Sequence, residues 1–392
     1  MSSFDIKVSL IFFTNFINKL KTIIYFVSED WYFCSHRLPI ARKALENGFK
    51  VVVITRVNKH RGIIESEGFE LAPIEINRGS MNLFSELRII STLYSYYKQY
   101  NPDIVHHVAI KPVIYGTLVA RFICSIKIVN AMAGLGFVFI SNKKKVKLLR
   151  LFIHRLFRFL FDNKNGQLIL QNKDDLDYFT KNKLVKKDQV TIIRGSGVDI
   201  KKFIPVEECT GIPIVMLASR MLWDKGVGEF VEAAKILKQE GVEARFVLVG
   251  KNDSENPASI SNSQLNEWNE LDIVEWWGDK TGMHKVLAQS SIVCLPSYRE
   301  GLPKVLLEAA SCGRAIIATD VPGCREIVHN GENGILVPLK NANSLASAIK
   351  ELLNKPEKRK IMGTNGRRLV ENEFSEETVV SQTLKVYQEL LA

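Results

Sequence analysis

Short runs of apolar and β-branched residues alternate along the first half of the chain with segments long enough to form helices. The strand-like runs lie at residues 22–27, 50–55, 104–105 and 126–130. Helix-length segments such as 38–47 and 85–100 separate them. Because strands that alternate with helices form parallel sheets covered by those helices, this half is predicted to be an α/β domain.

The same pattern begins again after Gly211. Strands are predicted at 212–217, 245–249 and 291–295. A helix is predicted at 228–240, and Gly241 ends it. The second half is therefore predicted to be another α/β domain.

A glycine-rich turn at 194–199 lies between the two halves and suits a hinge. We expect two Rossmann-like domains, residues 1–198 and 199–375, that face each other across a cleft. In open α/β sheets ligands bind beyond the carboxyl ends of the strands, so this cleft is the expected site.

The composition is that of a globular protein with 392 residues, 46% hydrophobic and 24% charged, which excludes a mainly disordered chain. The 6 cysteines are scattered without CxxC pairs, so neither a zinc site nor a disulfide framework is expected, and a reducing cytosol fits best. The apolar stretch at 8–17 is too short to span a bilayer and lacks a cleavage site. Neither a transmembrane helix nor a signal peptide is predicted.

Positive charge is concentrated in the first half. Residues 1–200 carry 30 Lys and Arg against 16 Asp and Glu, whereas residues 201–392 carry 23 against 26. Much of the excess lies in residues 143–161, where cations alternate with large apolar residues at helical spacing. Its first cations are Lys143, Lys144, Lys145, Lys147 and Arg150.

This segment is predicted to be a basic amphipathic helix, and two interpretations of it stay open. It is either a surface helix whose Leu and Phe residues lie in the core, or a helix that docks on an anionic membrane. Nucleic acid is not an expected partner, because the basic residues lie on one helix without an RNP, zinc-finger or KH pattern.

The strand that ends at Leu295 leads into a loop with the features of an anion site. The loop contains Glu300, Gly301, Leu302 and Pro303. Pro303 suits the first turn of a helix, and Gly313 closes that helix. The free amides of residues 301–304, reinforced by the helix dipole, would face an anion such as a nucleotide diphosphate.

Charged residues at two strand ends fit such a ligand. Glu300 lies in the loop and Glu308 about a turn and a half into the helix, so one carboxylate can face a sugar and the other a ribose hydroxyl. Arg220 and Lys225 follow the strand at 212–217 and could neutralise a diphosphate during bond cleavage.

Together these motifs resemble the donor-binding half of the retaining glycosyltransferases of family 4, which have the GT-B fold. The matching residues are Arg220, Lys225, Glu300 and Glu308 with seven residues between the two glutamates, and Gly323 with Glu326. The resemblance implies a UDP-sugar donor that is bound by Arg220, Lys225, Glu308 and the loop Gly301, Leu302 and Pro303, with the amides around Gly301 holding its diphosphate. It also implies that Glu300 orients the sugar, that no cofactor or metal is needed, and that residues 376–392 form a helix returning to the first domain.

The first half resembles a subgroup that includes a bacterial enzyme adding N-acetylgalactosamine to an undecaprenyl-diphosphate-linked sugar. The usual glycine-rich loop is replaced by residues 28–39, in which His36 and Arg37 are the candidate acceptor-binding residues. After the strand at 104–105, His106 or His107 is expected to hydrogen-bond the transferred sugar, with a structural role left open for either one.

The resemblance implies an α-1,3 linkage onto an N-acetylhexosamine, made at the cytoplasmic face of the inner membrane during O-antigen, capsule or glycan assembly. UDP-galactose and UDP-N-acetylglucosamine remain alternative donors. A UDP-sugar 2-epimerase and a non-catalytic scaffold are the rival classes; the basic, apolar first half argues against the epimerase, and the four charged donor residues argue against the scaffold.

Asp175 and Asp177 form a DxD triplet, a pattern that binds metal in the other glycosyltransferase fold. Here Asn172 precedes the acidic residues, which is the pattern of a helix start with its cap. We therefore expect no metal ligand at this position.

Overall fold

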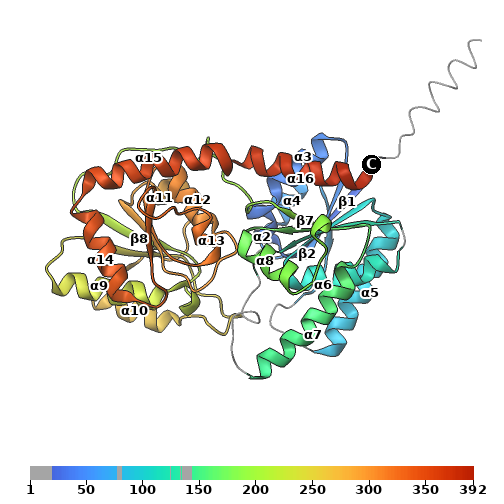
Figure 1. Cartoon of the computed structure of the whole chain (residues 1–392), viewed down its shortest axis with the longest axis horizontal. Coiled ribbons are helices and arrows are strands. Elements are labelled where there is room, and N and C mark those ends of the chain that lie inside the picture. Colours follow the sequence, from blue (N-terminus) through green and yellow to red (C-terminus); the bar gives the residue numbers. More distant parts are fainter. Residues whose placement is uncertain (1–19, 77–81, 124, 133, 135–143) are drawn as a thin grey trace, which may run out of the picture.

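The computed structural model describes residues 20–76, 82–123, 125–132, 134 and 144–392. Two α/β domains lie side by side, and helices α15 (Pro356–Glu373) and α16 (Glu376–Leu391) run along one side of both (Figure 1). This confirms the predicted pair of Rossmann-like domains.

The first domain is built on a seven-stranded parallel sheet in the order β3-β2-β1-β4-β5-β6-β7. Its strands are β1 (Thr22–Glu29), β2 (Lys50–Arg56), β3 (Glu70–Pro73), β4 (Ile104–Val108), β5 (Lys127–Met132), β6 (Gly166–Leu170) and β7 (Val190–Ile192). Every residue of β1 and β4 is buried, as expected for central strands covered on both faces.

Helices cover both faces of this sheet. They are α2 (Asp30–His36), α3 (Leu38–Glu46), α4 (Arg61–Ser66), α5 (Leu83–Tyr100), α6 (Ile110–Arg121), α7 (Lys144–Phe161) and α8 (Lys173–Lys181). One face packs with α3, and the other packs with α5 and α6, which gives the domain two buried apolar layers.

The second domain repeats the plan with a six-stranded parallel sheet in the order β10-β9-β8-β11-β12-β13. Its strands are β8 (Ile214–Ala218), β9 (Arg245–Val249), β10 (Glu275–Trp276), β11 (Ile292–Leu295), β12 (Ala315–Thr319) and β13 (Gly334–Val337). Its other helices are α9 (Val227–Gln239), α10 (Asn262–Glu270), α11 (Met283–Leu287), α12 (Lys304–Ser311), α13 (Pro322–Arg325) and α14 (Ala342–Leu353).

The chain crosses between the domains twice, and the two crossings touch. The amide of Val198 donates to the Phe374 carbonyl at 3.0 Å, and the amide of Glu376 donates to the Val198 carbonyl at 3.0 Å. A Cβ on Gly197 would lie 2.8 Å from the Glu376 Cα, so only glycine fits there. Helix α16 then packs on α3, with Tyr387 fully buried in the core of the first domain.

Candidate active site

The residues that follow β8 and β11 meet at the edge of the second sheet that faces the first domain. The Nζ of Lys225, in the 3₁₀ turn Trp223–Lys225, lies 2.5 Å from the Oε1 of Glu300. The Lys225 side chain is 20% exposed and that of Glu300 is 10% exposed, so the ion pair is largely shielded from solvent. The structure thus brings together two of the predicted donor-site residues from loops 75 positions apart.

Two glycines allow these loops to approach. A Cβ on Gly226, which has a φ of +73°, would lie 2.1 Å from the Pro296 carbonyl oxygen. A Cβ on Gly323 would lie 2.4 Å from the Gly301 carbonyl oxygen. The sequence needs glycine at both positions because the backbone of the Glu300 loop passes directly against them.

The N-terminus of α12 lies beside Glu300. Pro303 is the N-cap and the helix begins at Lys304. The backbone amides of Gly301, Leu302 and Lys304 donate no hydrogen bond within the part of the chain that the structure describes. These donors, together with the helix dipole, suit an anion, as the sequence predicts.

Arg220 forms an ion pair of its own in this structure. Its Nη1 lies 2.6 Å from the Oδ2 of Asp253, a residue in the loop after β9. The guanidinium is 40% exposed and Asp253 only 12%, so the arginine is reachable by a ligand while its partner holds it in place. Asp253 was not predicted from the sequence, because it lies 33 residues from Arg220 and no motif connects the two.

Glu308 lies one helical turn further along α12 than Lys304. Burial raises the pKa of its carboxyl to about 7, and the nearby Lys304 and Lys202 only partly offset this effect. The group therefore changes charge near neutral pH, unlike an ordinary glutamate.

Ion pairs and hydrogen bonds connect the two domains around this site. Arg56, at the end of β2, lies 2.7 Å from Glu29 and 2.9 Å from Glu255 of the second domain. The Nζ of Lys304 donates to the Ser35 carbonyl at 2.5 Å. These contacts hold the domains close together and place α2 over the N-terminus of α12.

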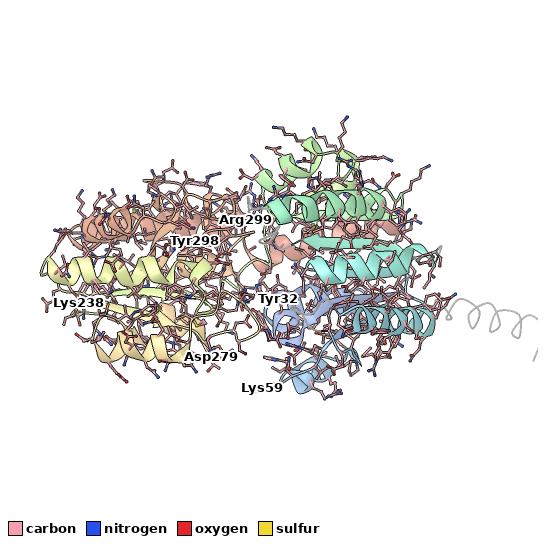
Figure 2. The ribbon with its side chains drawn as sticks, turned by 90° about the horizontal axis from the view of Figure 1, so that it is seen from below. Tyr32, Lys59, Lys238, Asp279, Tyr298 and Arg299 are labelled. Atoms are coloured by element: carbon pink, nitrogen blue, oxygen red, sulfur yellow. The ribbon has the colours of Figure 1, made fainter. Side chains whose placement is uncertain are left out.

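A second set of interdomain contacts involves α8. Arg299 lies 2.7 Å from Asp175, and Asn172 donates to the Gly301 carbonyl at 2.9 Å. Tyr32 and Arg299 are seen where the two domains meet (Figure 2). The sequence predicts a helix start at Asn172 and Asp175, and nothing in it indicates that they contact the Glu300 loop.

The helix-start interpretation of the DxD triplet is confirmed. Asn172 caps α8, and its side chain accepts from the Asp175 amide at 2.7 Å. Across the residues that could be placed, no group of three or more His, Cys, Asp or Glu side chains is arranged to hold a metal ion.

The two candidate histidines of β4 point to opposite faces of the sheet. His107 is fully buried, and its ring nitrogens lie 2.8 Å from the Tyr97 hydroxyl and 2.8 Å from Asn130 Oδ1. Both nitrogens are thus used inside the core, where α6 packs against the ring at Gly116. The expected contact between His107 and the sugar is therefore not supported, since the residue has a structural role.

His106 has a different environment. Its Nδ1 lies 2.5 Å from the Tyr387 hydroxyl of α16, and its Nε2 is buried without a partner. It lines a small cavity together with Arg37 rather than the loop that holds Glu300. His36 stacks on Tyr32, with 4.1 Å between ring centroids, and lies beside Lys304.

The basic helix at 143–161 is present as α7. Lys143 lies outside the described residues, and Lys144, Lys145 and Lys147 are placed in the helix by their backbone alone. Phe157, Leu160 and Phe161 are buried. The second half of α7 therefore packs its apolar side against the core of the first domain. Among the described side chains of α7, Leu151, Phe152 and Phe159 are exposed apolar groups, at 61%, 64% and 53%.

Arg150 is half-buried. None of the helices in the described ranges combines the length and the apolar character that crossing a bilayer requires.

Comparison with known proteins gives matches over both domains. Residues 22–172 match the family model "Glycosyl transferase 4-like", and residues 200–369 match "Glycosyl transferases group 1". An N,N'-diacetylbacillosaminyl-diphospho-undecaprenol alpha-1,3-N-acetylgalactosaminyltransferase from Campylobacter jejuni is 30% identical over 368 residues, covering 91% of this chain and 95% of that protein. A UDP-Gal:alpha-D-GlcNAc-diphosphoundecaprenol alpha-1,3-galactosyltransferase from Escherichia coli is 26% identical over 311 residues, covering 76% of this chain and 78% of that protein.

Solved structures show the same fold at lower identity. Sucrose-phosphate synthase from Thermosynechococcus elongatus has a TM-score of 0.79 at 20% identity, covering 94% of this chain and 99% of that one. HepE from Anabaena, in complex with UDP, has a TM-score of 0.74 at 16% identity, covering 94% and 100%. With matches of this extent in both domains, the chain belongs to the family 4 glycosyltransferases of the GT-B fold and is an enzyme of that class.

Proposed function

We propose that this enzyme transfers N-acetylgalactosamine from UDP-N-acetylgalactosamine to an N-acetylhexosamine carried by undecaprenyl diphosphate, forming an α-1,3 linkage with retention of configuration. The observation that carries the proposal is the Lys225–Glu300 pair beside the N-terminus of α12, at the edge of the second domain that faces the first. The donor and acceptor classes are taken from the names of the relatives in Campylobacter jejuni and Escherichia coli.

The donor site is assigned to the second domain. The amides of Gly301, Leu302 and Lys304, with Lys225 and Arg220, would hold the diphosphate and stabilise its charge as the glycosidic bond breaks. Arg220 would exchange Asp253 for the diphosphate, and Glu308 would accept hydrogen bonds from the ribose. Glu300, oriented by Lys225, would position the sugar.

In the proposed reaction the bond between the sugar C1 and the diphosphate oxygen breaks, and the acceptor oxygen bonds to C1 on the same face. The acceptor's proton passes to the leaving phosphate oxygen, so no protein nucleophile is required. The charges that Lys225 and Arg220 supply would perform the stabilisation that a metal ion provides in other glycosyltransferases.

The acceptor side is assigned to the first domain and to α7. A lipid-linked acceptor lies at a membrane, and the exposed Leu151 and Phe152 on a helix that begins with Lys144 and Lys145 would suit an anionic bilayer surface. We place the enzyme at the cytoplasmic face of the inner membrane, in the assembly of O-antigen, capsule or another glycan.

A donor competition tests the proposal. The purified protein is given UDP-N-acetylgalactosamine, UDP-galactose and UDP-N-acetylglucosamine at equal concentrations with a synthetic polyprenyl-diphosphate N-acetylhexosamine. Preferred transfer of N-acetylgalactosamine is expected, and the product mass identifies the donor. Preferred transfer of galactose or N-acetylglucosamine would overturn the donor assignment, and an epimerised UDP-sugar without transfer would indicate a 2-epimerase instead.

A further inference from the structure

Arg37 is a buried cation that has no counter-ion among the described residues. The residue is 4% exposed, its Nη1 donates only to the His36 carbonyl at 3.3 Å, and its Nε is buried without a partner. No acidic side chain in the described ranges is paired with it. Asp5 is the one Asp or Glu of the sequence that falls outside those ranges.

Another buried arginine in the same protein shows what a compensated guanidinium looks like. Arg359 is 7% exposed, lies 2.8 Å from Glu208, and donates to the Leu352 and Leu353 carbonyls at 2.7 and 3.1 Å. An ion that is removed from water needs such partners, because its lost hydration is otherwise not replaced. Arg37 lacks a comparable set of partners among the described residues.

Four titratable side chains near Arg37 are neutral and cannot offset its charge, namely His36, His106, Tyr32 and Tyr387. Burial, followed by the charge of Arg37 itself, holds the pKa of His106 well below its ordinary range. Burial and the charges of Lys304 and Arg37 do the same for the pKa of His36. Burial also raises the pKa of Tyr32 and of Tyr387, so both phenols stay protonated at neutral pH.

Arg37 and His106 line a common cavity of about 10 Å³, which has room for roughly one water molecule or one oxygen atom. Gln171 after β6, Gly195 of the hinge and Thr383 of α16 complete its polar lining. The Nε of Arg37 and the Nε2 of His106 are both buried and unpartnered, so the cavity offers a charged donor beside a neutral imidazole.

The cavity lies on the first-domain side of the donor site. Burial raises the pKa of Tyr32, and the charges of Arg37 and Arg220 partly offset that rise, since both guanidinium groups lie near this ring. Arg37 and the proposed diphosphate-binding arginine thus lie near the same ring, one in each domain. An anion at Arg37 would be separate from the donor diphosphate.

We propose that the Arg37–His106 cavity is an oxyanion-binding subsite, which takes one oxygen of a phosphate or diphosphate group and supplies the missing counter-charge. The anion comes either from free inorganic phosphate or from the diphosphate of the lipid-linked acceptor. Only the second source rests on the proposed function, since anion binding itself can be measured without turnover.

The test compares thermal unfolding of the wild type, Arg37→Met and Arg359→Met, with UDP at saturation so that the donor site is filled. Each protein is titrated with inorganic phosphate and with a short-chain prenyl-diphosphate sugar, against sodium chloride at the same ionic strength. UDP binding, measured separately by calorimetry, reports on the donor site alone, so that a failure there is distinguished from a failure of the subsite.

Arg37→Met is expected to unfold at a higher temperature than wild type without added phosphate, by about 2 °C or more, because an uncompensated charge has been removed. It should lose the phosphate-dependent rise that the wild type shows. Arg359→Met should unfold at a lower temperature and keep that rise. A response to inorganic phosphate identifies a free anion as the occupant, and a response to the prenyl-diphosphate sugar alone identifies the acceptor.

The proposal is overturned if neither probe stabilises the wild type beyond the chloride control, or if wild type and Arg37→Met respond equally. It is also overturned if Arg37→Met unfolds at a lower temperature than wild type in the absence of phosphate. Should that variant fail to fold, Arg37→Lys decides the question: it retains the charge and must keep a weakened phosphate response, and its loss of stability without any such response contradicts the subsite.

Discussion

Replacing Lys225 with methionine separates its two roles, the ion pair with Glu300 and the contact with the departing diphosphate. Methionine keeps much of the length and apolar surface of the lysine side chain while removing the charge. The Glu300 carboxylate, which is 10% exposed, then loses its partner at 2.5 Å.

The stability effect follows from the burial of the pair. Breaking a fully buried ion pair costs about 3–5 kcal/mol, and an exposed pair contributes about 0–1 kcal/mol. With side chains 20% and 10% exposed, the pair lies between these limits. We expect Lys225→Met to lower the free energy of unfolding by about 1–3 kcal/mol, and Glu300→Gln in the same chain to restore much of it.

The catalytic effect is expected to be larger and not to be restored. Loss of one preorganised charge contact to a leaving group typically lowers the rate by about 10²–10³. Initial rates with a radiolabelled UDP-sugar give kcat and KM for Lys225→Met and for the double variant. Both should remain slow, because adding Glu300→Gln repairs the unpaired carboxylate and not the diphosphate contact.

Lys238→Met serves as the matched control. Lys238 pairs with Asp272 at 2.9 Å and lies on the side of the second domain away from the first (Figure 2). Its replacement should leave kcat/KM unchanged. Near-wild-type turnover of Lys225→Met, or recovery of activity in the double variant, would refute the assignment of Lys225 to the leaving group.

Three further predictions concern Glu308, the metal independence of the donor site, and α7. Because burial raises the pKa of Glu308 to about 7 and its ionised form is the better acceptor for ribose hydroxyls, kcat/KM for the donor should fall as the pH drops below 7. Glu308→Gln should abolish this fall of kcat/KM at low pH. If the variant shows the same fall, another titrating group causes it. Chelation with EDTA should leave the rate unchanged, whereas complete loss restored by manganese would contradict a diphosphate site built on Arg220 and Lys225. Replacing Lys144, Lys145 and Lys147 with Glu should weaken binding to anionic vesicles, since each basic residue near such a surface contributes about 1 kcal/mol. Equal sedimentation of wild type and variant with vesicles would show that α7 has no membrane role.

The strand pattern predicted the central strands because they are buried on both faces. Residues 22–27 and 50–55 match β1 and β2 within two residues at each end. The edge strands were harder to find, since β10 contains two residues and β3 ends in Pro73. Short edge strands carry too few apolar positions to give a periodic signal.

The donor loops could be predicted from sequence, because their motifs are local. The roles of the two histidines could be predicted only in part. Adjacent residues of a strand point to opposite faces of the sheet, so His106 and His107 could not both reach one site. Both rings are buried, and the partner of His106, Tyr387 of α16, is 281 residues away in the sequence. The pairing of Arg56 with Glu255 likewise depends on how the two domains pack together, and no short-range pattern encodes a contact between residues 199 apart.

The most direct test of the central claim is the structure of the product. Transfer from UDP-[1-¹³C]-N-acetylgalactosamine to a synthetic undecaprenyl-type diphosphate N-acetylhexosamine, followed by NMR, reports both the anomeric configuration and the linkage position. The account predicts an α-linked N-acetylgalactosamine on O3 of the acceptor sugar. A β linkage would contradict the retaining mechanism, and the absence of transfer to any lipid-diphosphate sugar would contradict the proposed function.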